Sequence, residues 1–300
     1  MKRVLTVAAA VVMMAALVLS AAAIPAGQQT AKKLKVYISV DMEGVSGLIN
    51  WDETAAPGPD YNLFRRLMTE EANAAITGAL DAGATEIVVR DAHDTARNIL
   101  PDQLRAEAQL IREWNSPLSM MEGIDRTFDA VVFIGYHARA GTPDAVLKHT
   151  MSSTTIFDVI LNGVREPEGG WNAAIAGYFD VPVAFLSGDS AICKQIKEIL
   201  GDQVETVAVK EGMGRAAKML HPLKSQELIR KGVAASLRNL KALRPYKPTS
   251  PYKLEVVFTD ENYAQRASWV PGIVRTGERS VSYTGNDFMD VIKYFRLMRL

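Results

Sequence analysis

Carboxylates and imidazoles follow several strand-like runs in the sequence, and these two residue types can bind a metal ion together. Asp41 and Glu43 come directly after the first run, His93 follows the second and His137 follows the third. Glu168 follows a fourth run, just before a helical stretch. Such a mixed set suits zinc that keeps a position open for water. Because the set exceeds what one tetrahedral catalytic zinc takes, we predict two metals that share one carboxylate, as in co-catalytic hydrolases.

Each of these residues also has a purely structural interpretation. An Asp-x-Glu pair at a strand end is common in turns and helix caps, and His93 or His137, taken singly, would be a hydrogen-bonded structural histidine. The metal prediction depends on convergence, because three of only 4 histidines fall at or just beyond strand ends or in the adjoining loop. The carboxyl ends of strands in an open α/β sheet are where functional groups gather.

Strand-like and helical patterns alternate along the chain, which predicts an α/β fold with a mostly parallel sheet flanked by helices. Apolar runs such as 131–134 are typical of strands covered on both faces. We expect strands at 35–40, 86–90, 130–136, 156–162, 181–187 and 204–209, and helices at 61–82 and 226–240.

The C-terminal part of the sequence has a different pattern. Residues 242–251 are rich in proline, lysine and serine and predict a linker. Strands at 253–259 and 279–284 and a closing helix from about 286 are expected to follow. The sequence therefore predicts an α/β metallohydrolase core over 24–240 and a smaller C-terminal α+β portion over 241–300.

Longer strings surround the candidate ligands and occur in order over nearly the whole mature chain. They are SVDMEGVSG at 39–47, MTEEAN at 68–73, DAH at 91–93, GYHARA at 135–140, Glu168 with NA at 172–173, and AGYFDVPV at 176–183. Together these strings resemble the zinc-dependent D-aminopeptidase family. The combined pattern is highly specific, although each string alone is short.

The resemblance implies roles for particular residues. It implies that two zinc ions are bridged by Asp41, with the remaining ligands Glu43, His93, His137 and Glu168. It also implies a catalytic histidine shortly after the third motif, and the matching residue is His149. We expect an acid/base or electrophilic role for His149 rather than a nucleophilic one, because metal-activated water makes a covalent step unnecessary. The alternative is a polar loop residue.

The same resemblance implies an activity. The expected enzyme is an aminopeptidase that removes N-terminal D-residues, above all D-alanine, from short peptides such as those released in cell-wall turnover. A ring-like homo-oligomer that encloses the active sites is also implied. Two alternatives stay open: an amidase or esterase on the same two-metal site, and an exported protein that binds metal or solute without catalysis. Arg139 would pair with a substrate carboxylate or with a nearby acid.

The first 23 residues have the pattern of a secretory signal peptide. Lys2 and Arg3 precede an apolar run that reaches Leu19 and ends in small residues before a cut after Ala23. The run is short for a spanning helix, which needs roughly 20 apolar residues. We expect cleavage, export to the periplasm or the medium, and no stable membrane span in the mature chain.

Composition and the remaining motifs exclude other functions. The 34 basic and 34 acidic residues balance, so electrostatic binding to nucleic acid is not expected. Cys193 is the single cysteine, which excludes an internal disulfide, and it is expected to be a small buried residue. The string GMGRAA at 212–217 superficially fits a dinucleotide fingerprint, but Pro222 falls early in the required crossover. Glu70 and Glu71 are expected on a solvated helix face, with a role behind the metal ligands as the alternative.

Overall fold

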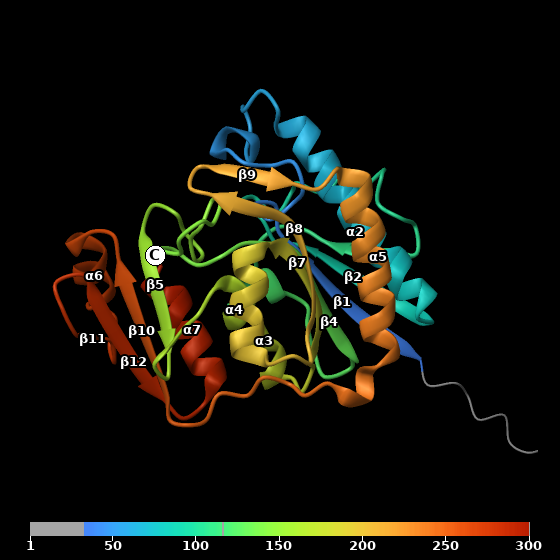
Figure 1. Cartoon of the computed structure of the whole chain (residues 1–300). Coiled ribbons are helices and arrows are strands. Elements are labelled where there is room, and N and C mark those ends of the chain that lie inside the picture. Colours follow the sequence, from blue (N-terminus) through green and yellow to red (C-terminus); the bar gives the residue numbers. More distant parts are fainter. Residues whose placement is uncertain (1–32, 116, 300) are drawn as a thin grey trace, which may run out of the picture. The chain divides into compact units, whose positions relative to one another are not determined.

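A computed structural model of the chain describes residues 33–115 and 117–299 (Figure 1). The predicted signal peptide, residues 1–23, lies outside the described residues. The described residues form one compact unit that contains two β-sheets. In this part of the chain, no helix combines the length and apolar character that crossing a membrane requires.

The larger sheet has seven strands in the order β3-β2-β1-β4-β7-β8-β9, and all neighbours are parallel except β8 and β9. Its strands are β1 (Leu34–Val40), β2 (Ala84–Asp91), β3 (Ala108–Ile111), β4 (Ala130–Tyr136), β7 (Val183–Asp189), β8 (Glu205–Met213) and β9 (Ala216–Met219). The chain runs outward from β1 to β2 and β3 and then returns to β4 on the other side of β1. Ligand sites in open α/β sheets lie at such a switch point.

Helices cover both faces of this sheet, which explains why its central strands are apolar throughout (Figure 1). The helices α2 (Tyr61–Asp81) and α5 (Pro222–Arg238) pack together on one face. The other face carries α3 (Glu168–Tyr178) and α4 (Ser190–Leu200). Short 3-10 helices lie at η1 (Trp51–Glu53), η2 (Ser119–Met121) and η3 (Leu240–Ala242). The predicted α/β architecture is confirmed.

The smaller sheet is antiparallel and has the order β11-β12-β10-β5-β6. Its strands are β5 (Ile156–Leu161), β6 (Val164–Arg165), β10 (Tyr252–Phe258), β11 (Val274–Arg275) and β12 (Ser280–Gly285). The helices α6 (Glu261–Ala267) and α7 (Phe288–Met298) pack against it. The strand expected at 156–162 therefore forms, but it belongs to this sheet rather than to the parallel one. The smaller sheet therefore combines strands from before and after residue 240.

Two sequence features take a different form from the one their patterns suggested. The proline-rich segment before β10 has no regular structure but is packed, because a Cβ on Gly177 of α3 would lie 1.8 Å from the Tyr246 carbonyl oxygen. The GMGRAA string forms the β8–β9 hairpin, in which Gly212 pairs with Ala217, so no helix follows the glycines and no dinucleotide site exists there. Cys193 is buried in α4, as predicted.

Candidate metal centre

The loop after β1 brings two carboxylates to the carboxyl edge of the sheet. The Asp41 amide donates to the Ile134 carbonyl at 2.8 Å, so the loop starts in register with β4. The Gly44 amide then donates to the Gly135 carbonyl at 2.7 Å. A Cβ at Gly44 would lie 1.9 Å from the Tyr136 carbonyl oxygen, so only glycine allows this approach. Asp41 and Glu43 are consequently held beside the end of β4, both 2% exposed.

The two predicted histidine ligands come from the strands on either side of β1. His93 follows β2, and its Nδ1 lies 3.2 Å from Asp41 Oδ1 and 3.0 Å from Glu43 Oε2. His137 follows β4, and its Nε2 lies 3.3 Å from Asp41 Oδ2 and 3.3 Å from Glu168 Oε2. Because β2, β1 and β4 are adjacent and parallel, their carboxyl ends deliver all these groups to one place.

Glu168 reaches the same place from a helix. It is the first residue of α3, and its Oε1 accepts a hydrogen bond from the Met151 amide at 2.6 Å. The β5–β6 hairpin separates this residue from the parallel sheet, so Glu168 does not stand at the end of a parallel strand. Its position depends instead on the packing of α3 against β4.

His149 also faces the cluster. Its Nε2 lies 3.5 Å from Glu168 Oε1 and 3.8 Å from Glu43 Oε1, and its ring stacks on that of His137. The side chain is 11% exposed, whereas that of His137 is fully buried, so His149 is the more accessible of the two to a bound molecule. The structure thus brings the predicted catalytic histidine to the five predicted ligands.

Backbone carbonyls fix which nitrogen each histidine turns to the carboxylates. His93 Nε2 lies 2.9 Å from the Thr54 carbonyl, His137 Nδ1 lies 3.1 Å from the Ala138 carbonyl, and His149 Nδ1 lies 2.9 Å from the Leu147 carbonyl. A carbonyl only accepts, so the nitrogen beside it carries the hydrogen. The other nitrogen of each ring is then free to present a lone pair to a cation, which is the arrangement of metal-binding histidines.

The donor set fits a divalent metal. Three groups of side chains each have ligand atoms within 4.8 Å of one another: Asp41 with Glu43 and His93, Asp41 with His137 and Glu168, and Glu43 with His137 and His149. Three buried ligand atoms have no hydrogen-bond partner, namely Asp41 Oδ2, Glu43 Oε2 and His137 Nε2. Buried polar atoms are rarely left unpaired, so these atoms indicate a cation site. Asp41 belongs to two groups and could bridge two ions.

Electrostatics of the cluster favour ionised carboxylates. Burial raises the pKa of Asp41, but the adjacent imidazoles of His137 and His93 outweigh burial and bring the pKa below its ordinary value. Burial likewise raises the pKa of Glu168, but the charge of His137 lowers it to about 2. Burial lowers the pKa of His93, but the charge of Glu43 raises it well above its ordinary value. Protons on the imidazoles balance the carboxylates here, and a divalent cation would replace these protons.

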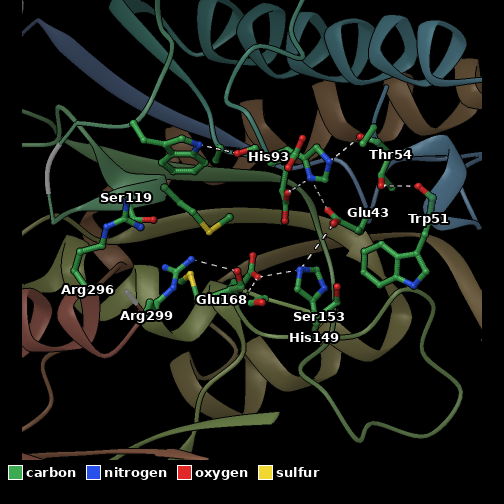
Figure 2. A pocket seen from close by; sticks show the side chains of 18 residues that line it. Glu43, Trp51, Thr54, His93, Ser119, His149, Ser153, Glu168, Arg296 and Arg299 are labelled. Atoms are coloured by element: carbon green, nitrogen blue, oxygen red, sulfur yellow. Dashed lines mark hydrogen bonds and ion pairs between the residues drawn. The ribbon is translucent and has the colours of Figure 1, made fainter. Parts of the chain in front are cut away.

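The cluster lies at the floor of a cavity of about 390 Å³ (Figure 2). Figure 2 shows Glu43, His93, His149 and Glu168 directed into this space. Trp51 of η1 lies at one side of the cavity and is 41% exposed. Its ring meets the His149 ring edge-on, with the two ring centroids 5.4 Å apart. A small molecule that enters the cavity can therefore reach the cluster and His149 together.

Two buried ionisable residues support the first loop, and the sequence patterns did not identify one of them, Lys210. Lys210 of β8 donates to the carbonyls of Glu43, Val45 and Leu48 at 2.5, 3.0 and 2.6 Å. Glu71 of α2 accepts from the Ser46 amide at 2.9 Å and is 1% exposed. The expectation that Glu71 lies on a solvated face was wrong, because α2 packs its side chain against the loop. Glu70 does lie nearer the surface, paired with Arg66.

A buried carboxylate at the end of β2, that of Asp91, stabilises the loop that carries His93. The Asp91 carboxylate accepts from the Asn98 and Ile99 amides at 2.5 and 2.7 Å. The Asn98 side chain in turn donates to the His93 carbonyl at 2.6 Å. These bonds close the loop that carries His93. Asp91 stands in the predicted strand-end string, but only the folded loop reveals which amides it binds.

Two other polar residues lie outside the site. Arg139 does not line the cavity, and among the described residues no ion pair joins it to an acid. Its backbone amide donates to Gln195 Oε1 at 3.2 Å. His221 caps α5 by accepting from the Leu223 amide at 3.3 Å. The fourth histidine is therefore structural.

A parallel α/β sheet with buried carboxylates and imidazoles at its switch point defines the class of α/β metallohydrolases. The chain belongs to the D-aminopeptidase family within this class, because the family model matches residues 34–297. It is thus a peptidase, and the predicted family is confirmed.

Two known proteins document the similarity. A D-aminopeptidase of Bacillus subtilis (strain 168) is 37% identical over 270 residues, which cover 88% of this chain and 96% of the relative. A solved structure, described as the Zn-dependent D-aminopeptidase DppA from Bacillus subtilis, a self-compartmentalizing protease, superposes with a TM-score of 0.85 at 36% identity. That match covers 89% of this chain and 97% of the solved chain.

Proposed function

We propose that this protein is an exported, zinc-dependent aminopeptidase that hydrolyses short peptides with N-terminal D-residues, D-alanine above all. The observation that carries the proposal is the buried cluster of carboxylates and imidazoles beneath an open cavity. The family supplies the reaction type, and the similarity to a Zn-dependent enzyme supports zinc as the metal.

Two zinc ions are proposed, with Asp41 between them. One ion would take Glu43 and His93, and the other would take His137 and Glu168, in line with the two groups that share Asp41. Bound zinc supplies Lewis acidity for the scissile carbonyl and lowers the pKa of water toward neutrality. Carboxylate and imidazole ligands leave positions open for water and substrate, as catalytic zinc requires.

His149 is proposed to move the proton during hydrolysis. Its Nδ1 donates to the Leu147 carbonyl at 2.9 Å, so the ring is fixed with Nε2 toward the cavity floor. A proton accepted there can be passed to the leaving amine when the peptide bond breaks. The edge of Trp51 restricts the ring from the side of the cavity. These contacts hold one orientation of His149 without blocking its access to substrate.

Export and assembly complete the proposal. The signal-peptide pattern over residues 1–23 supports export to the periplasm or the medium, which cell fractionation with N-terminal sequencing of the mature chain would test. The description of DppA as self-compartmentalizing supports a homo-oligomer that encloses its active sites. Light scattering after size-exclusion chromatography would give the number of subunits.

The decisive experiment is hydrolysis of D-Ala-D-Ala and L-Ala-L-Ala by the zinc-supplied mature chain, beside a His137→Ala control. Cleavage of the D-dipeptide alone, lost in the control, is the expected result. Cleavage of simple amides or esters but of neither dipeptide would favour an amidase or esterase on the same site. Zinc binding with no hydrolysis of any of these compounds would favour a non-catalytic binding protein.

A further inference from the structure

Two arginines border the cavity on the side away from Trp51 (Figure 2). Arg296 lies in the last turn of α7 and Arg299 caps the end of that helix. Two arginines of the smaller sheet have acidic partners: Arg165 pairs with Asp158, and Arg275 pairs with Glu261 at 2.9 Å. In the described part of the chain, neither arginine of the cavity has a carboxylate within ion-pair distance.

Arg299 is held in place without being neutralised. Its Nη2 donates to the Met151 carbonyl at 3.3 Å, and its guanidinium lies 5.6 Å from the centre of the Phe295 ring. Burial, together with the neighbouring charge of Arg296, lowers the pKa of Arg299 to about 10. Guanidinium groups are cationic, so two like charges lie along one wall of the cavity. An anion bound between them would relieve their repulsion.

The floor of the same cavity holds the proposed zinc ligands. Asp41, Glu43 and Glu168 provide three carboxylates at its floor, whereas the arginines provide two cations at its border. A short peptide has its first peptide carbonyl near one end and a free carboxylate at the other, so a peptide whose carbonyl lies at the metal ligands can place its carboxylate at the arginines. Two residues span at most about 7 Å, and a cavity of about 390 Å³ has room for only a few residues.

We propose that Arg296 and Arg299 bind the C-terminal carboxylate of the peptide substrate and so select short peptides with a free C-terminus. A guanidinium binds a carboxylate with two parallel hydrogen bonds, and most donors of both arginines have no partner among the described residues. The inference rests on the proposed peptidase function. It assigns to α7 the part of substrate recognition that the metal cluster does not provide.

The test compares D-Ala-D-Ala with its C-terminal amide on the zinc-loaded enzyme. The wild type is expected to prefer the free acid by about ten- to a hundredfold in kcat/KM. Arg296→Met and Arg299→Met are expected to lose most of this preference through a higher KM, while activity on the amide changes little. Arg299→Lys keeps the charge without the paired donors and should fall between. Lys293→Gln removes an exposed charge of the same helix and should leave the preference intact.

A binding measurement separates this inference from the proposed function. Calorimetry would compare an uncleavable analogue of D-Ala-D-Ala, whose peptide carbonyl is reduced to methylene, with the amide of that analogue. Tighter binding of the free acid, lost in both methionine variants, supports the carboxylate site even if no peptide is cleaved. Equal binding of the two analogues, or an equal loss on acid and amide in the kinetics, would overturn it.

Discussion

The imidazole rings of His137 and His149 stack face to face, with centroids 4.0 Å apart and planes 7° from parallel. Both rings turn Nδ1 to a backbone carbonyl and Nε2 to the carboxylates. The stack therefore presents two imidazole nitrogens to the Glu168 carboxylate, His137 to Oε2 and His149 to Oε1. His137 is fully buried beside Asp41, whereas His149 borders the cavity, so a division into ligand and proton carrier follows from their burial.

This division predicts the effect of His149→Gln. The variant is expected to lose about 10²- to 10⁴-fold in kcat, because it lacks the group that moves the proton. Its zinc content should equal that of the wild type, since the proposed ligands are intact. Kinetics on D-Ala-D-Ala and metal analysis of the same preparation check both parts. A variant that has lost a full equivalent of zinc would show that His149 is a ligand instead.

Removal of metal is expected to destabilise the protein as well as inactivate it. Chelation leaves the buried carboxylates without a compensating cation, so thermal unfolding should occur at a lower temperature. Zinc added back at a hundred times its Kd should restore the activity and about 2.7 kcal/mol of stability for each ion bound. Asp41→Asn should abolish this response, whereas Asp202→Asn, in an exposed turn, should not. An unchanged response in Asp41→Asn would contradict the bridging role.

Lys210→Met tests the support of the first loop. The substitution leaves the carbonyls of Glu43, Val45 and Leu48 without their buried donor. A loss of about 2–4 kcal/mol in the free energy of unfolding is expected, together with weaker zinc binding. Urea titration and metal competition measure the two effects. Lys218→Met, at an exposed position of β9, is the matched control, and a loss of similar size there would rule out the explanation.

Glu71 predicts a dependence of stability on pH. Burial raises its pKa from 4.5 to about 7, although the hydrogen bond from the Ser46 amide opposes the rise. The folded state then binds the proton more tightly than the unfolded state, so this contribution is present at low pH and is lost as pH rises from about 4.5 to 7. The loss is at most about 3 kcal/mol.

Glu71→Gln should remove this contribution. The decrease in the free energy of unfolding between pH 5 and pH 8 is expected to be smaller in Glu71→Gln than in the wild type. Urea titrations at both pH values measure the difference. Glu205→Gln, at an exposed position, should keep the decrease of the wild type. Parallel curves for wild type and Glu71→Gln would show that Glu71 does not titrate in this range.

Much of the fold could be predicted because its signals are local. The apolar run of β4 was placed at its observed bounds, Ala130–Tyr136, and α2 was placed to within a residue. By contrast, β5 looks the same in sequence whether its partners are parallel or antiparallel, and its partner β10 lies far along the chain. The short edge strand β3 has too few apolar residues to stand out.

Some residues of the candidate site could likewise be predicted from local signals, and others could not. The rule for strand ends located Asp41, His93 and His137, since each follows a strong strand signal. Lys210 could not be found, because its partners are backbone carbonyls of a distant loop whose shape no sequence pattern specifies. The arginines of α7 were also missed, since their place at the cavity depends on how that helix packs against α3.

The pairing of β5 with β10 has a consequence for the order of events during protein synthesis. A ribosome releases β1 and its loop early, but β5 can pair only with the short strand β6 until β10 has emerged. Asp41 and Arg299 border the same cavity from near opposite ends of the described chain. A partly synthesised chain therefore cannot assemble the whole cavity until the last helix has left the ribosome.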